Sequence, residues 1–197
     1  PGVERDLVVR ELRAGLADDP TVVRTFEARI ERYVALAHPG LVPVRDHWRE
    51  PGAAYVVMDR RYGGTLADRL QDGPLDPPDV ARLVERVGGA LAAAAAVGLV
   101  HGRVRPDDVF WDADRGPCLG DLGWVGPMHL VDDVVGLAHL VRDALGDPAP
   151  GVAAVLDQAT TPAGAPAMEA LVTEFLVALR GGSATSDGPP PNPYKGL

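Results

Sequence analysis

The residues most able to do chemistry gather in one stretch, LVHGRVRPDDVFWDADRGPCLGDLGW at residues 99–124. Asp108 and Asp121 could together hold Mg²⁺ with help from the phosphate oxygens of a ligand, because this cation prefers oxygen ligands. His101 is expected to pack and hold the backbone rather than transfer protons. Arg103 is a permanent cation that accepts no hydrogen bond. The stretch therefore resembles a site for handling phosphate that lacks a proton acceptor at residue 103.

Other reactive groups have simpler structural explanations. Adjacent acids occur at Asp107-Asp108 and Asp132-Asp133, and such residues more often cap helices or turns than form acid–base pairs. The five histidines show no metal-ligand spacing. Cys118 is the single cysteine, which excludes an internal disulfide and a cysteine-rich zinc site. We expect it to be an inert buried thiol.

The acidic composition narrows the classes of partner. The formal net charge is -9 and the pI is about 4.9, so neither nucleic acid nor an anionic membrane would attract the chain. We therefore expect a protein partner or a small ligand. No apolar run of about twenty residues predicts a membrane span, and no basic segment followed by an apolar one predicts a signal peptide. These features favour a cytoplasmic protein.

Hydrophobic periodicity predicts a small mixed lobe followed by a larger helical one. Short β-branched runs indicate strands, and apolar residues at helical spacing indicate helices. The predicted strands are 6–10, 40–48 and 53–59, with two very short ones at 109–111 and 117–121. The predicted helices are 18–37, 78–97, 129–147, about 150–160 and about 166–180, with a short one within 63–70.

The character of the chain changes after Arg180. The tail GGSATSDGPPPNPYKGL is rich in Gly, Ser and Pro, so it buries too little apolar surface to order itself. We predict one domain over residues 1–181 and a flexible linker over 182–197 that leads to a following domain.

In order along the chain, several segments resemble the protein kinase family from about residue 7 to residue 180. VHGRVRPDDVF stands where the family has its catalytic loop H-R-D-L-x-x-x-N, and GDLG stands where it has D-F-G. HPGLVPVRDHW, YVVMDRRYGGTLADRL and DVVGLAHLV resemble further family segments. The resemblance implies an α+β, two-lobed, protein-kinase-like fold. Its reduced N-lobe spans about 1–58, its hinge 59–64 and its shortened, mainly helical C-lobe 65–181.

The resemblance also implies roles for single residues. Met58 takes the gatekeeper-like position beside the nucleotide, and Asp133 matches the aspartate that braces the catalytic loop backbone. Arg10 stands at the position of the strand lysine, Arg29 at that of its helix glutamate, and Arg103 at that of the catalytic aspartate. Each of these three arginines departs from the family pattern.

These departures predict that phosphotransfer has been lost. Arg103 cannot act as a base, and Arg10 facing Arg29 would replace an ion pair by repulsion. Glu27 or Glu31 could substitute only if the helix were rotated. The only lysine of the chain is Lys195 in the tail. On this ground we predict a pseudokinase of actinobacterial type that is not an enzyme.

Two segments of the family pattern are shortened or missing. Only nine residues, WVGPMHLVD, separate Gly123 from Asp133, which leaves no room for an activation segment. Residues 1–6 leave no room for a glycine-rich loop, which is either lacking or lies upstream. Trp124 could fill the cleft where adenine or phosphate would bind.

The predicted function is protein interaction or regulation by a catalytically inactive domain of a larger bacterial signalling or defence protein. The alternative is a nucleotide-sensing switch in which Arg10, Met58, Asp108 and Asp121 hold ATP and Mg²⁺ without chemistry. Apart from that alternative, we predict no cofactor. NPYKGL at the end of the tail resembles the start of a STAND-type NTPase module.

Overall fold

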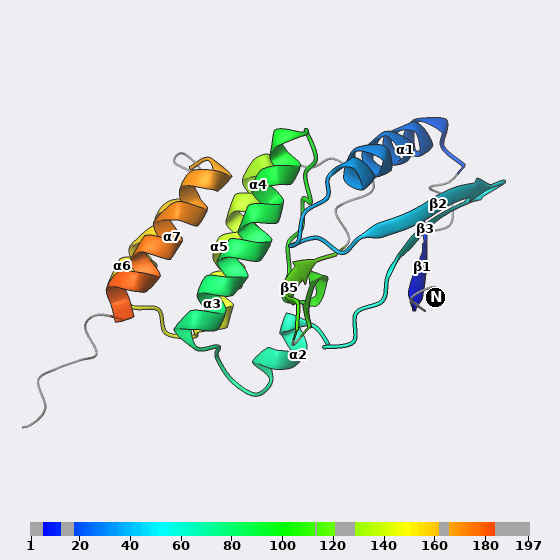
Figure 1. The fold of residues 1–197 in the computed structure, drawn as a ribbon. Coiled ribbons are helices and arrows are strands. Elements are labelled where there is room, and N and C mark those ends of the chain that lie inside the picture. The colour runs from blue at the N-terminus through cyan, green and yellow to red at the C-terminus, as the bar shows by residue number, and fades with distance from the viewer. Residues whose placement is uncertain (1–5, 13–17, 113, 121–128, 162–165, 184–197) are drawn as a thin grey trace, which may run out of the picture.

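A computed structural model describes residues 6–12, 18–112, 114–120, 129–161 and 166–183. A three-stranded sheet with one helix is followed by a short two-stranded sheet and a group of helices (Figure 1). The elements, in chain order, are β1 (Leu7–Glu11), α1 (Pro20–Ala35), β2 (Val44–Glu50), β3 (Ala53–Asp59), α2 (Leu66–Leu70), α3 (Pro77–Leu83), the π-helical turn η1 (Val84–Gly88), α4 (Gly89–Ala96), the 3₁₀ turn η2 (Pro106–Asp108), β4 (Val109–Asp112), β5 (Gly116–Leu119), α5 (Leu130–Leu145), α6 (Pro150–Thr160) and α7 (Met168–Ser183).

The N-terminal sheet is antiparallel with strand order β1-β3-β2. The central strand β3 aligns Val57 with Val9 of β1, and the other edge strand, β2, is bulged after Val44. Helix α1 begins after Asp19, whose side chain accepts the backbone N–H groups of Thr21 and Val22. Its buried face joins the same core as β3, so this helix and the sheet form one small lobe.

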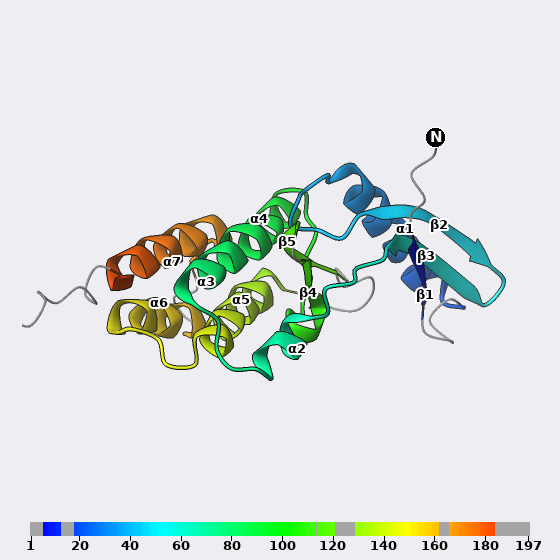
Figure 2. The same ribbon diagram turned by 60° about the horizontal axis from the view of Figure 1, so that its bottom comes forward.

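The two-stranded sheet of β4 and β5 lies between this lobe and the helices (Figure 2). The segment before β2 joins it, because the backbone N–H of Val42 donates to the carbonyl of Leu119 at 2.9 Å, and Leu41 bridges the same residue. The predicted strand 40–48 is therefore two pieces: residues 41–42 meet β5, and only 44–50 lie in the first sheet.

The long helix predicted at 78–97 is interrupted by η1. At Gly88 in this turn an added Cβ would lie 2.5 Å from Cγ2 of Val172, so only glycine lets α7 approach so closely. Helix α7 runs to Ser183, two residues beyond the predicted domain end. Within the described residues, no helix combines the length and apolar character needed to cross a bilayer.

Candidate functional site

Loop 99–108 follows α4 and ends in η2, and the carboxylate of Asp133 of α5 binds its backbone. This carboxylate is 2% exposed. Its Oδ2 accepts the backbone N–H of His101 at 2.8 Å, and its Oδ1 accepts that of Gly102 at 2.6 Å. Burial raises the pKa of Asp133, and the two N–H donors oppose that rise. Both carboxylate oxygens are thus engaged in shaping the loop.

His101 holds the same loop from its other side. The buried imidazole places Nε2 3.1 Å from the carbonyl oxygen of Gly120, and its Nδ1 accepts the backbone N–H of Arg103 at 3.3 Å. A neutral ring with its proton on Nε2 satisfies both bonds at once. The side chain is therefore fixed to backbone groups on both nitrogens.

Arg103 presents a cation at the surface of this loop. Its backbone is bound to His101, while its side chain is exposed. A guanidinium has N–H donors and no acceptor, so no general base stands at this residue.

Asp108 lies at the end of η2, beside the end of β5. Its carbonyl accepts the backbone N–H of Gly120 at 2.8 Å, and its own N–H donates to the carbonyl of Arg105. An added Cβ at Gly120 would lie 2.8 Å from Cε2 of Phe110, so this contact also requires glycine. The predicted metal partner of Asp108, Asp121, lies outside the described residues, as does Trp124.

The N-lobe residues of the predicted site lie on separate elements. Arg10 is exposed on β1 opposite Val56, and Met58 is buried in β3 between β1 and β2. Arg29 is half-buried on α1, where burial first and Arg32 second lower its pKa. The cation that acts on Arg29 is thus its neighbour one turn along the helix.

Glu27 pairs with a residue that the sequence did not suggest. Its carboxylate accepts Nη1 of Arg49 on β2 at 3.1 Å. Within the described residues, no group of three or more His, Cys, Asp or Glu side chains is arranged to hold a metal.

Sequence reasoning missed an ion pair behind the hinge. Nη1 of Arg61 donates to Asp112 of β4 at 2.9 Å, and the other oxygen of Asp112 accepts the backbone N–H groups of Tyr62 and Gly63. The side chain of Arg61 is 6% exposed. The position of Asp112 at the end of the apolar run VFW was the only sequence signal that could have placed it outside the core.

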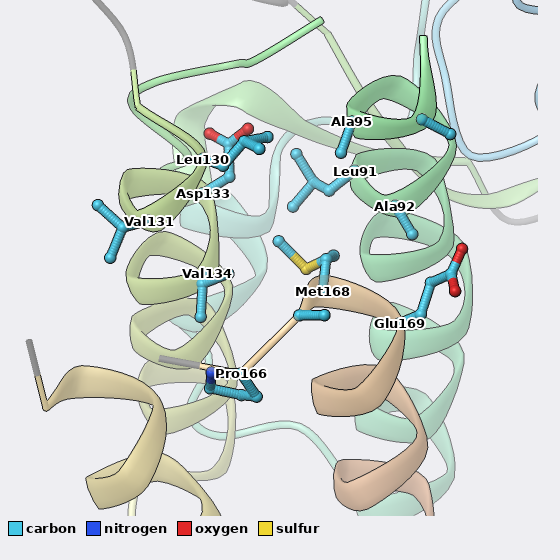
Figure 3. A pocket seen from close by; sticks show the side chains of 12 residues that line it. Leu91, Ala92, Ala95, Leu130, Val131, Asp133, Val134, Pro166, Met168 and Glu169 are labelled. Atoms are coloured by element: carbon cyan, nitrogen blue, oxygen red, sulfur yellow. The ribbon is translucent and has the colours of Figure 1, made fainter. Parts of the chain in front are cut away.

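Sequence reasoning also missed an apolar cavity of about 390 Å³ between α4, α5 and the start of α7. Figure 3 shows Leu91 and Ala95 of α4 facing Val134 of α5, with Met168 below them. Leu130 and Val131 are exposed at its margin although both are apolar. The carboxylate of Asp133 reaches this cavity too, but its oxygens are bound to loop 99–108.

Comparisons with known proteins place this geometry in a family context. No family model matches the chain. It is 32% identical over 126 residues to the serine/threonine-protein kinase PknB of Mycobacterium leprae, and 36% identical over 122 residues to PknE of Mycobacterium tuberculosis. Each match covers 61% of this chain but only 20% or 21% of the relative, so the chain spans about a fifth of the length of these relatives.

Solved structures show the fold. The kinase domain of Mycobacterium tuberculosis PknI, in a double-mutant form, superposes with a TM-score of 0.74 at 23% identity, covering 91% of this chain and 87% of that chain. Another crystal structure of that kinase domain gives a TM-score of 0.72 over 87% of this chain and 85% of that one. The predicted two-lobed, kinase-like fold is confirmed.

The prediction that the chain is not an enzyme is contradicted. The relatives are named serine/threonine protein kinases, and the similar structures are kinase domains. The prediction rested on the chemistry of Arg103 and on the missing lysine. That chemistry shows only that residue 103 accepts no proton, and it leaves carboxylates such as those of η2 able to do so.

Taken with the fold and the geometry of loop 99–108, these relatives identify the chain as a protein-kinase-like domain homologous to bacterial serine/threonine protein kinases.

Proposed function

We propose that this kinase-like domain regulates a larger bacterial signalling protein by binding a protein partner or a neighbouring domain of its own chain. The observation that carries the proposal is the surface of loop 99–108. Asp133 and His101 hold its backbone, while the side chains of Arg103 and Arg105 are exposed. A loop that is already ordered loses little conformational entropy when a partner binds it.

The exposed side chains suggest the chemistry of the contact. A guanidinium offers a planar fork of N–H donors that pairs with a carboxylate through two parallel bonds. Asp107, exposed on the same loop, adds an acceptor beside Arg103 and Arg105. We propose that the partner segment carries acidic side chains and at least one matching donor.

Site-specific photo-crosslinking tests this proposal. A photoreactive residue at the exposed position 107 of the same loop, or at 180 as a control on the exposed end of α7, is introduced into the protein in its host cell. We expect one species to crosslink from 107 and not from 180. When purified, it should bind the chain with an affinity that Arg103→Glu weakens about tenfold, since opposite charges then become like charges. An affinity that does not respond to the charge at residue 103 would contradict the proposal.

A second candidate function, phosphotransfer to serine or threonine, is favoured by the names of the relatives. Because residue 103 accepts no proton, the base would have to be another group. We propose Asp108 of η2, whose backbone carbonyl accepts the N–H of Gly120 at 2.8 Å. A labelled-phosphate assay with ATP, Mg²⁺ and generic protein substrates tests it. Turnover that Asp108→Asn removes and Asp147→Asn retains would support this candidate, whereas absent turnover of the unaltered chain would exclude it.

Nucleotide sensing is a further proposal, in which Arg10, Met58 and Asp108 contact ATP and Asp121 shares the metal. A ligand that binds only the folded state stabilises it by about 2.7 kcal/mol at a hundred times its Kd. Thermal unfolding with and without ATP and Mg²⁺ measures this effect. A melting temperature that ATP and Mg²⁺ leave unchanged would exclude the switch.

The setting of the domain is likewise a proposal. We infer a cytoplasmic location from the single cysteine, because a chain that forms no internal disulfide suits a reducing compartment. We infer a following NTPase module of the STAND type from NPYKGL in the tail. Sequencing the gene beyond residue 197 tests the proposed NTPase module. A phosphate-binding loop encoded shortly after NPYKGL would support the module, and a downstream sequence without such a loop would contradict it.

A further inference from the structure

A second cavity, of about 360 Å³, lies behind the hinge and is lined by an unusual number of cations. Three arginines from three different segments line it: Arg61 of the hinge, Arg86 of η1 and Arg115 of the turn between β4 and β5. His38 and Asp114 complete its polar lining, and Cys118 closes it from β5. In a chain with a net charge of -9, three guanidinium groups around one cavity are a local reversal of charge.

Arg61 brings a buried polar atom without a partner to the lining of this cavity. Its side chain is 94% buried, with an exposed fraction of 6%. One end of the guanidinium is bound to Asp112, whereas its Nε, also buried, has no hydrogen-bond partner among the described residues. A buried N–H without an acceptor is unfavourable, and such groups commonly await a ligand or water. An oxyanion in the cavity would provide the missing acceptor.

The charges of the three guanidinium groups also act on one thiol, that of Cys118, which lines the same cavity. Burial raises the pKa of Cys118 to about 11, and the charges of Arg61, Arg86 and Arg115 all oppose that rise. Arg86 also lowers the pKa of His38, after the larger effect of burial. The thiol is thus protonated and inert, so the cavity is suited to binding an anion and not to thiolate chemistry.

The backbone around the cavity is closely packed. An added Cβ at Gly40 would lie 2.0 Å from the carbonyl oxygen of Arg86, so segment 38–43 rests directly on η1. Nδ1 of His38 accepts the N–H of Gly40 at 3.0 Å, which fixes the imidazole as a neutral ring. Among the described residues, Arg86 and Arg115 form no ion pair, so their charges remain available for a ligand.

We propose that this cavity binds a phosphate monoester group, such as that of a phosphorylated serine or threonine side chain. A phosphate monoester has several acceptor oxygens and up to two negative charges, so it can pair with three guanidinium groups better than a single carboxylate can. Recognition of phosphorylated side chains by arginine clusters is a recurrent mode of peptide binding. The cavity also has more volume than a bare phosphate ion fills, which leaves room for the side chain that carries the group. The proposal is independent of the function proposed for loop 99–108.

Nuclear magnetic resonance titration of the ¹⁵N-labelled 197-residue chain tests the site. The probes are N-acetyl-phosphoserine amide, inorganic phosphate, and N-acetyl-serine amide as the uncharged control. We expect phosphoserine amide to give saturable shifts at the backbone N–H groups of the residues that line the cavity, and serine amide to give none. The N–H groups concerned are those of His38, Leu41, Arg61, Arg86, Asp114, Arg115 and Cys118. Tighter binding of phosphoserine amide than of inorganic phosphate would identify a phosphorylated side chain as the ligand, whereas equal affinity would identify free phosphate.

Charge-removing variants assign the binding to the cavity. Arg86→Gln with Arg115→Gln should weaken binding about tenfold or more, since two charge-assisted contacts are lost. Arg180→Gln, which removes one positive charge from the exposed end of α7, should change it less than about twofold. Arg61 is left intact because its ion pair with Asp112 supports the fold, and circular dichroism checks that each variant is folded. Shifts that do not saturate, or equal weakening by Arg180→Gln, would overturn the proposal.

Discussion

The carboxylate of Asp133 binds two backbone N–H groups that lie 31 and 32 residues before it in the chain. Burial is unfavourable for a charged carboxylate, but each of its two oxygens accepts a hydrogen bond from a backbone N–H. These two bonds offset the cost of burying the charge. His101, on the same loop, binds backbone groups through both ring nitrogens. At this scale, the loop owes its shape to side chains that bind backbone.

Asp133→Asn should therefore destabilise the fold. An amide keeps one acceptor and turns a donor toward the other N–H, so one buried N–H loses its partner, at a cost of about 1–3 kcal/mol in the free energy of unfolding. Urea denaturation measures it. Asp143→Asn, which alters an exposed carboxylate on the same helix, should change stability by less than about 0.5 kcal/mol. Equal effects of the two variants would show that the N–H contacts are unimportant.

Cys118 makes stability depend on alkaline pH. Burial raises the pKa of its thiol from 9.0 to about 11, so between these values the unfolded chain has lost the proton that the native one retains. Stability from this group is complete below pH 9 and decreases as pH rises to about 11, by roughly 2–3 kcal/mol. Denaturant unfolding at pH 8 and pH 11 should show a larger decrease for the unaltered chain than for Cys118→Ala. A decrease of the same size in both would refute this account.

At the scale of elements, two neighbouring glycines have opposite surroundings at the junction of η1 and α4. Gly88 touches α7 and α5, where an added Cβ would lie 2.5 Å from Cγ2 of Val172 and 3.1 Å from Cδ2 of Leu137. At Gly89 the nearest atoms belong to His38, at an ordinary 3.5 Å. The helical lobe is therefore closely packed around Gly88, whereas the space beside Gly89 can accept an added Cβ.

This contrast predicts opposite outcomes for the same substitution. Gly88→Ala should lower the free energy of unfolding by about 1–3 kcal/mol, because α7 must shift. Gly89→Ala should be neutral or raise it by about 0.5–1 kcal/mol, because alanine is the better residue in a helix. Thermal unfolding of the pair gives the comparison. A stable Gly88→Ala variant would mean that α7 can move away freely.

At the scale of the whole molecule, the N-lobe is joined to the rest by few but specific links. Residues 41–42 bind Leu119 of β5. Arg61, just after β3, binds Asp112 of β4. Both links end on the two-stranded sheet, so β4 and β5 position the hinge relative to loop 99–108.

Breaking the hinge link should be costly. Asp112→Asn leaves the cation of Arg61 buried without its counter-charge, and loss of one partner of a buried pair costs about 3–5 kcal/mol; because Asp112 is 19% exposed, we expect the lower end. Asp157→Asn removes an exposed partner of Arg142 and should cost at most about 1 kcal/mol. Urea unfolding should separate the two variants. If their midpoints coincide, the link is dispensable.

The amino-acid sequence by itself determined the order of strands and helices, because periodicity and capping residues are local signals. The kinase-like fold was implied by the resemblance of its motifs to those of the protein kinase family. The sequence also brought His101 and Asp133 to attention, through the motifs on either side of them. Its inference about enzymatic activity failed, because the chemistry of one side chain excludes a role for that residue and not for the whole domain.

Only the tertiary structure decided the features that depend on residues distant in sequence. These are the interruption of the long helix where α7 passes Gly88, the pairing of Glu27 with Arg49, and the ion pair of Arg61 with Asp112. The cavity with three arginines belongs with them. No local pattern reveals such sites, because burial and charge become coupled only after the chain has brought separate segments together.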